Sequence, residues 1–185
     1  MGGCSGRELK GVLIMGMFAT TMAFRRPEKM DWEKYRPRLE DILQTLNGAV
    51  TDLSEDADAY GYLSFDPEDG MMVPELLEAI TLASEDFGVC AQVCDSDFCL
   101  LQLYHCGVLL QECALGNVYE EYAEIAPMEG PKMDLWLPLL KDEAQKDAFL
   151  EVFEQEWVFA EDGLRELAKL TGLPLLDDSL MEQIY

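Results

Sequence analysis

The segment VCAQVCDSDFCLLQLYHCGVLLQEC, residues 89–113, contains the clearest structural pattern in the chain. Apolar residues fill three short runs, which are interrupted by Asp95-Ser96-Asp97 and by Cys106-Gly107. Apolar runs of this length between turn residues are typical of sheet strands, and glycine accepts the positive φ that a tight hairpin requires. We therefore predict a hairpin tip at Cys106-Gly107 and three consecutive strands: Val89–Cys94, Phe98–His105 and Val108–Leu115.

The N-terminal region permits two interpretations. Arg7 and Lys10 precede an apolar stretch, residues 11–24, in which Thr21-Met22-Ala23 is a passable cleavage site, as in a secretory signal. Residues 17–24, however, alternate small and large side chains and contain two threonines, which is the pattern of a half-buried strand. We favour the strand.

Two helices and a second strand are expected before residue 89. The first helix starts near Pro37, where a missing N–H costs least, and it ends at Asn47-Gly48. An acidic loop, residues 51–59, then precedes a strand at YGYLSFD, residues 60–66. Pro74 opens the second helix and Gly88 closes it. The residues expected to be buried by these helices are Leu39, Ile42, Leu43 and Leu46, and then Leu76, Leu77, Ile80 and Ala83.

The predicted order is βαβαβββ, which favours an α+β fold with a two-layer, ferredoxin-like sheet whose strand order is left open. Residues 116–185 are mainly helical and form a C-terminal helical layer on the same core. They include a short helix at 118–125, a longer one at 142–157 that buries Phe149 and Val152, and a capped one from Asp162 to Gly172.

The length of 185 residues favours one domain over the whole chain, with the sheet in residues 17–115. Residues 10–12 can be encoded by a ribosome-binding sequence a short distance before Met15. We therefore predict that residues 1–14 are a non-native or disordered extension. No apolar run is long enough to span a membrane.

The charge is distributed unevenly along the chain, which has a net charge of −24. Residues 39–131 contain twenty acidic residues and neither lysine nor arginine. Affinity for nucleic acid comes largely from lysine and arginine that displace counterions, so this composition argues against a nucleic-acid partner. It favours a basic protein partner, although acidity that merely keeps a bacterial cytosolic protein soluble is the simpler interpretation.

The cysteines lack the spacing of a zinc site, because no CxxC pair occurs. On a strand, Cys90 and Cys94 lie roughly 13 Å apart, too far to share a metal ion. With the tip at Cys106-Gly107, Cys99 is predicted to face Ala114, and a slip of one residue would instead pair it with Cys113 in a disulfide. We favour buried, free thiols in a reducing cytosol. His105 is the only histidine and has no predicted catalytic partner.

Three carboxylates could gather at strand ends. Asp95 and Asp97 lie between two predicted strands and Asp66 ends another, and Mg²⁺ or Ca²⁺ takes oxygen ligands. The alternative is that these residues bond backbone N–H groups in turns. A metal site built from Asp66, Asp95 and Asp97 is retained as a hypothesis.

The basic residues before residue 39 form a cluster that could bind an anionic ligand or an acidic partner. We favour compensation by acidic residues of the same chain or of a second copy in a homodimer. The cluster comprises Arg25, Arg26, Lys29, Lys34, Arg36 and Arg38.

These observations favour a non-catalytic, cytoplasmic protein-binding module that uses no cofactor, such as an immunity or inhibitor protein with an acidic surface. The alternative function is a metal-dependent enzyme that uses the three strand-end carboxylates.

Overall fold

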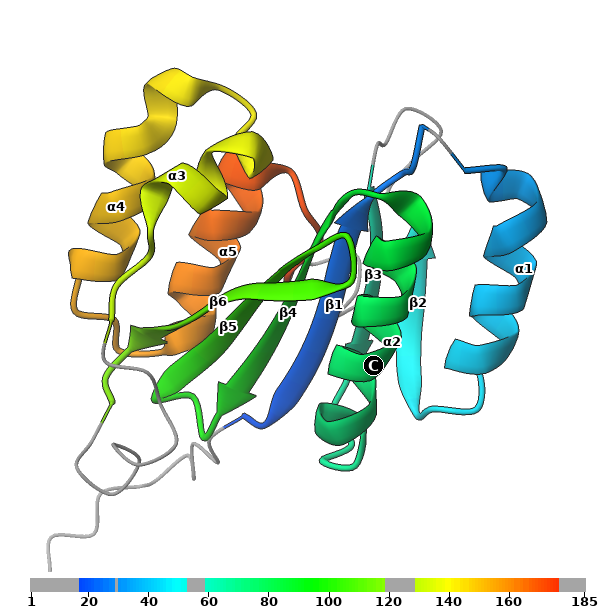
Figure 1. The fold of residues 1–185 in the computed structure, drawn as a ribbon. Coiled ribbons are helices and arrows are strands. Elements are labelled where there is room, and N and C mark those ends of the chain that lie inside the picture. The colour runs from blue at the N-terminus through cyan, green and yellow to red at the C-terminus, as the bar shows by residue number, and fades with distance from the viewer. Residues whose placement is uncertain (1–16, 29, 53–58, 119–128, 177–185) are drawn as a thin grey trace, which may run out of the picture.

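The computed structural model of the chain describes residues 17–28, 30–52, 59–118 and 129–176. Figure 1 shows a central sheet with helices on both sides of it. The elements are, in order, β1 (Ala19–Arg25), α1 (Trp32–Leu43), β2 (Gly48–Asp52), β3 (Ala59–Ser64), α2 (Asp69–Ser84), β4 (Phe87–Cys94), β5 (Phe98–His105), β6 (Val108–Gly116), α3 (Met133–Trp136), η2 (Leu137–Leu139), η3 (Glu143–Gln145), α4 (Lys146–Glu154) and α5 (Ala160–Thr171).

The sheet has six strands in the order β2-β3-β1-β4-β5-β6, and all neighbouring strands are antiparallel. β3 lies between β1 and β2, and β1 lies between β3 and β4. Each of α1 and α2 therefore connects two strands that are separated by one other strand. Two interlocked split βαβ units of this kind are the ferredoxin-like arrangement. β5 and β6 extend the sheet beyond β4. The predicted α+β class and the C-terminal helical layer are confirmed.

The two faces of the sheet carry separate hydrophobic cores. α1 and α2 pack on one face around residues such as Met22 and Leu77. The α3–α5 layer packs on the other face around residues such as Leu101 and Leu164. We expected all helices to share one core in two layers, and the structure differs because the central strand β1 is buried at every position from Ala19 to Phe24. A strand that is apolar on both faces requires cover on both sides.

The strands predicted from residues 89–113 are confirmed within two residues at each end. The tip at Cys106-Gly107 is confirmed as well, with φ values of 51° and 75°. β2 was not predicted. It pairs with β3 and includes residues 51 and 52, the first two of the expected acidic loop, and residues 53–58 of that loop lie outside the described residues.

The first two helices begin earlier than predicted, so Pro37 and Pro74 lie inside α1 and α2. A proline inside a helix removes the N–H that would bond the carbonyl four residues before it. For Pro74 that carbonyl belongs to Gly70, and Gln92 Nε2 donates a hydrogen bond to it over 2.7 Å. For Pro37 it belongs to Glu33, an exposed residue in the first turn of α1. The prolines are tolerated because the carbonyls they leave free have other partners or lie in an exposed turn.

α2 ends at Ser84 and not at Gly88. Glu85 follows in the left-handed conformation, with a φ of 54°. Gly88 instead lies in β4, where a Cβ atom would come within 2.5 Å of Leu77 Cδ1. Its glycine therefore reflects the close approach of α2 to the sheet.

The C-terminal helices are shorter or displaced relative to the prediction. The segment expected to form one helix over 142–157 contains η3 and α4, and α5 begins two residues before Asp162 and is capped by Gly172 at a φ of 73°. α3 and η2 were not predicted, and residues 119–125 of the expected short helix lie outside the described residues. Among the described residues, no helix combines the length and apolar character needed to cross a membrane.

Candidate functional site

Asp95, Ser96 and Asp97 form the turn between β4 and β5. Asp95 and Ser96 have φ values of 52° and 59°, as in the mirror-image turns that suit tight hairpins. The Asp97 N–H donates to Cys94 O over 3.1 Å, and the Asp95 side chain is exposed. The local geometry is that of a turn.

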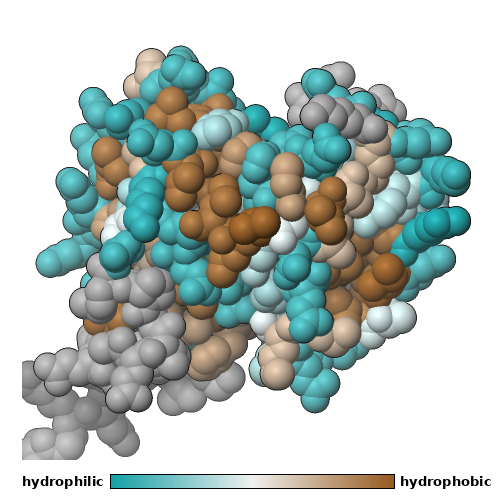
Figure 2. Space-filling model, in the orientation of Figure 1, coloured by the Kyte–Doolittle hydropathy of each residue, from teal (hydrophilic) through white to brown (hydrophobic). Residues whose placement is uncertain are grey.

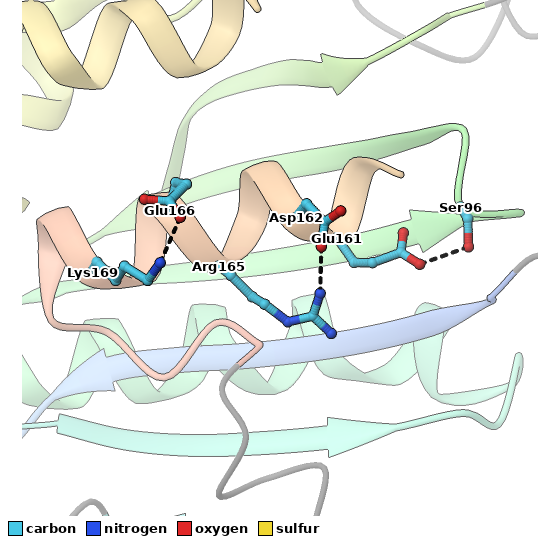
Figure 3. A network of polar contacts seen from close by, with 6 residues as sticks. All are labelled: Ser96, Glu161, Asp162, Arg165, Glu166 and Lys169. Carbon is cyan, nitrogen blue, oxygen red and sulfur yellow. Dashed lines mark hydrogen bonds and ion pairs between the residues drawn. The ribbon is translucent and has the colours of Figure 1, made fainter. Parts of the chain in front are cut away.

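Ser96 is the most connected residue of this turn, and the sequence analysis did not single it out. It is only 5% exposed. Its Oγ accepts a hydrogen bond from the Met17 N–H over 2.7 Å and donates one to Glu161 over 2.9 Å (Figure 3). Its carbonyl accepts from the Ala160 N–H over 2.8 Å. Ser96 thus joins the start of α5 and the residues before β1 to the β4–β5 turn.

Asp66 satisfies backbone and side-chain donors near the start of α2. The Glu68 N–H donates to its Oδ1 and Asn47 Nδ2 donates to its Oδ2, each over 2.9 Å. The bonds from Asn47 and from the Glu68 N–H lower the pKa of this carboxyl below its ordinary value. Both oxygens are therefore already engaged.

The three carboxylates are not assembled into a ligand set. β1 lies between the strands that Asp66 and Asp95 follow, and two strand spacings separate such positions by roughly 9–10 Å. In the part of the chain that the structure describes, no group of three histidine, cysteine, aspartate or glutamate side chains could hold a metal ion.

The register of β5 and β6 differs from the prediction by one residue. Cys99 lies opposite Leu115, and Cys113 lies opposite Leu101. The cause is an irregularity next to Tyr104, where β6 contains one extra residue and the pairing shifts. The shift moves Cys99 away from direct pairing with Cys113.

The five described cysteines are free, and three of them are fully buried. Burial raises the pKa of Cys90 and Cys113 to about 12, and it raises that of Cys99 well above the ordinary value. A thiol with such a pKa stays protonated near neutral pH and is a poor nucleophile and metal ligand. The prediction of buried, free thiols is confirmed for these three positions.

His105 lies at the end of β5. Its ring stacks on Phe87 of β4, with a centroid distance of 4.1 Å, and a ring nitrogen lies 3.5 Å from Cys106 Sγ. Phe87 and His105 are directly opposite in the register. The stacking explains the position of the ring as a cross-strand packing contact.

The basic cluster near the N-terminus is partly compensated within the chain, as expected. Arg26 pairs with Glu33 over 2.7 Å, and Arg36 pairs with Glu40 over 2.9 Å. Arg25 instead donates to the carbonyls of Pro138 and Leu139, over 3.0 and 2.7 Å. Lys29 lies outside the described residues, and the side chains of Lys34 and Arg38 are exposed.

One side of α2 presents an exposed stripe to the solvent. Met71, Glu75, Glu78 and Leu82 follow the spacing i, i+4, i+7 and i+11, so they lie on one side of the helix. All four are exposed, Met71 to 81% and Leu82 to 63%. A helix that covers a sheet usually exposes polar residues on this side, so the two large apolar side chains are unusual.

The stripe adjoins the tip of the β5–β6 hairpin. Leu82 lies so close to Gly107 that a Cβ there would come within 2.7 Å of the leucine Cβ, and Thr81 Oγ1 accepts a hydrogen bond from the Gly107 N–H over 3.1 Å. Val108 and Leu109, which begin the edge strand β6, are 57% and 41% exposed. Figure 2 shows hydrophobic surface in the area that β6 and α2 occupy in Figure 1.

Acidic residues accompany these apolar side chains. Burial raises the pKa of Tyr104 to about 12, and the charges of Cys90, Glu112 and Glu78 act in the same direction. Glu112 also accepts a hydrogen bond from Gln102 across β5 and β6 over 2.7 Å. We call this area the α2–β6 surface and define it by Met71, Glu75, Glu78, Leu82, Leu109 and Glu112.

The sequence analysis did not locate this surface, although it identified the acidic zone that contains it. Leu82 and Leu109 are distant in the sequence and meet only through the hairpin tip. The spacing from Met71 to Leu82 was the available signal, because it places two exposed apolar residues on the side opposite the predicted buried stripe.

Comparisons with known proteins do not assign the chain to a family. No protein-family model matches it, and searches of curated proteins and of solved structures likewise found no match.

Proposed function

We propose that the chain is a non-catalytic protein-binding module, of the immunity or inhibitor type, whose α2–β6 surface binds a basic amphipathic segment of a partner. The observation that carries this proposal is the combination of exposed Leu82 and Leu109 with Glu78 and Glu112 on one surface. Apolar anchors bordered by charges are typical of protein interfaces.

Charge complementarity selects the kind of partner. The surface lies within residues 39–131, which contain neither lysine nor arginine. A partner with basic side chains around an apolar stripe would place its cations near Glu75, Glu78 and Glu112, and its apolar residues on Leu82 and Leu109. Opposite charges also accelerate the encounter at low salt. A second copy is a weaker candidate, because each copy carries a net charge of −24.

A cytoplasmic location is part of this proposal. The five described cysteines are free, and three are buried, which agrees with folding in a reducing compartment.

The test is affinity capture from lysate of the native host with two charge-matched triple variants. Glu75→Gln, Glu78→Gln and Glu112→Gln alter the proposed surface. The control, Glu151→Gln, Glu154→Gln and Glu156→Gln, removes the same charge from exposed residues at and beyond the end of α4. We expect the wild type and the control to retain a basic protein at about 50 mM salt. The surface variant should retain at least tenfold less of it. Retention should also fall at about 500 mM salt, because salt screens such charges.

An apolar pair of variants separates specific docking from attraction by net charge. Leu82→Ser should weaken capture at least tenfold, whereas Val158→Ser, at a site that is 82% exposed, should not. Equal capture by both triple variants, or by both serine variants, would contradict the proposal. Sedimentation of the purified protein tests whether a second copy binds this surface instead. If the protein is a dimer and Leu109→Ser dissociates it, the partner of the α2–β6 surface is a second copy and not a basic protein.

A further inference from the structure

A cleft of about 660 Å³ lies at the end of the sheet where β1 ends. Its lining includes the last residues of α2, the residues that follow η2, and the C-terminal end of α5. Figure 1 shows the C-terminal ends of α2 and α5 at this same end of the sheet. The volume is within the range of about 300–1,000 Å³ that is typical of small-molecule sites.

The lining of the cleft contains three cations from both halves of the chain, Arg25, Arg26 and Lys141, and Arg26 is paired with Glu33. Arg25 ends β1, and its guanidinium is held by the carbonyls of Pro138 and Leu139. Lys141 follows two residues later, and its backbone N–H donates to Leu170 O over 3.0 Å. Both side chains line the cleft, and among the described residues neither forms an ion pair with a carboxylate. The carbonyls that hold Arg25 are neutral, so no carboxylate within the described residues balances its charge.

The position of Lys141 is fixed by the end of α5. Gly172 has a left-handed φ of 73°, and a Cβ there would come within 2.5 Å of Lys141 Cε. The lysine stem therefore packs directly on the glycine, which brings the ammonium group to the cleft.

Three carboxylates also line the cleft, Glu28, Glu85 and Asp86. Asp86 follows α2, and its Oδ1 accepts a hydrogen bond from the Phe87 N–H over 2.7 Å, which orients the side chain. Glu28 lies beyond the end of β1. Within the described residues, no cation lies in ion-pair range of Asp86 or Glu28.

We infer that the cleft binds a small zwitterion that carries one carboxylate and one ammonium group, the simplest class being free α-amino acids. The ligand carboxylate would lie on Arg25 and Lys141, and its ammonium group on Asp86 and Glu28. A polyanion is disfavoured by the three carboxylates of the lining, Glu28, Glu85 and Asp86, and a pure cation by Arg25, Arg26 and Lys141. This site is separate from the α2–β6 surface, so it does not depend on the proposed protein-binding function.

The test uses the protein L-α-amino acids singly at about 10 mM in thermal melts, followed by titration calorimetry of any that bind. A ligand present at ten times its Kd raises the Tm by about 3–5 °C in a protein of this size. For the best amino acid, we expect the N-acetyl derivative, which lacks the ammonium charge, and the α-amide, which lacks the carboxylate, to bind at least tenfold more weakly.

Two variants assign the binding to the cleft. Lys141→Met and Asp86→Asn should each raise the Kd at least tenfold, and asparagine retains the oxygen that accepts from the Phe87 N–H. Lys146→Met, at an exposed residue that starts α4, is the matched control and should leave the Kd unchanged. The proposal is overturned if no amino acid shifts the Tm, if the N-acetyl derivative or succinate binds as well as the amino acid, or if Lys141→Met binds normally.

Discussion

The two faces of hairpin β5–β6 contrast sharply although they belong to the same two strands. On the face covered by α3–α5, Cys99, Leu101, Leu103, Cys113 and Leu115 are all buried. On the face shared with α2, Leu100, Gln102 and Ala114 are half-buried, and Leu109 and Glu112 are exposed.

The difference shows which face of the hairpin is covered by helices, here called the closed face, and which is accessible to a partner, here called the open face. α1 and α2 cover β1, β3 and β4 but leave β5 and β6 partly open, whereas the C-terminal layer seals the opposite face. The alternation along β5 and β6 is that of an antiparallel pair with one core face and one accessible face. We therefore place the structural role on the closed face and the proposed protein-binding role on the open one.

The largest expected difference in stability is between alanine variants of two leucines, which lie on helices that pack on opposite faces of the sheet. Leu164→Ala, in α5 on the closed face, removes a fully buried side chain and should lower the free energy of unfolding by about 2–5 kcal/mol. Leu82→Ala, in α2 on the open face, should change it by less than about 0.5 kcal/mol. Urea denaturation at 25 °C measures both. Equal losses would show that Leu82 is part of the core, and the proposed surface would then be withdrawn.

A smaller loss of stability should follow from removing the Ser96 hydroxyl, which links α5 to the β4–β5 turn. Ser96→Ala removes the hydroxyl that bonds the Met17 N–H and Glu161, and should cost about 1–3 kcal/mol because a buried donor and acceptor lose their partner. Asp95→Ala is the matched control, since it has a similar positive φ but an exposed side chain. If the two variants are equally stable in urea, the hydroxyl does not anchor α5.

The buried thiols of the closed face should make stability depend on alkaline pH. Their pKa values are raised in the folded state, to about 12 for Cys113, while unfolded cysteine titrates near about 8.5. The unfolded state therefore releases protons first, and stability that is fully present below about pH 8.5 is lost as the pH rises towards 12.

Each such thiol contributes at most about 1.4 kcal/mol per pH unit in this range. Cys113→Ala should reduce the slope of unfolding free energy against pH between about 9 and 10.5 by up to that amount, as measured by urea denaturation at several pH values. An unchanged slope would mean that the Cys113 thiol already ionises in the folded state.

The sequence predicted the strands of the hairpin well but not how their faces are covered. Residues 89–113 specify their own turns, because Gly107 permits the tip and apolar runs mark the strands. Coverage depends instead on strands such as β1. Its alternation of small and large side chains favoured a half-buried strand, although both of its faces are buried, and it does not reveal which helices lie on which face. β2 was missed for a related reason: it is short, and its pairing depends on Gly48 fitting against the ring of Tyr62.

The candidate sites show the same limit. The acidic zone was visible in the sequence, but the α2–β6 surface requires the contact between Leu82 and Gly107, and the cleft requires Arg25 and Lys141 to line the same cavity. Asp66, Asp95 and Asp97 were selected because strand ends can converge. The position of β1 between β3 and β4 keeps the strands that they follow apart, and this depends on a strand order that local patterns do not encode.

The smallest effect concerns the exposed ion pairs of α5, which lie beside the buried Ser96–Glu161 contact (Figure 3). Arg165 pairs with Asp162 over 2.7 Å at i,i+3 spacing, and both side chains are at least one-third exposed. Arg165→Gln should lower the free energy of unfolding by no more than about 0.5 kcal/mol, and this difference should vanish at about 1 M salt, because solvent and ions screen exposed pairs. A loss that approaches that of Ser96→Ala and persists at high salt would mean that the arginine stem, and not its charge, helps α5 to seal the closed face.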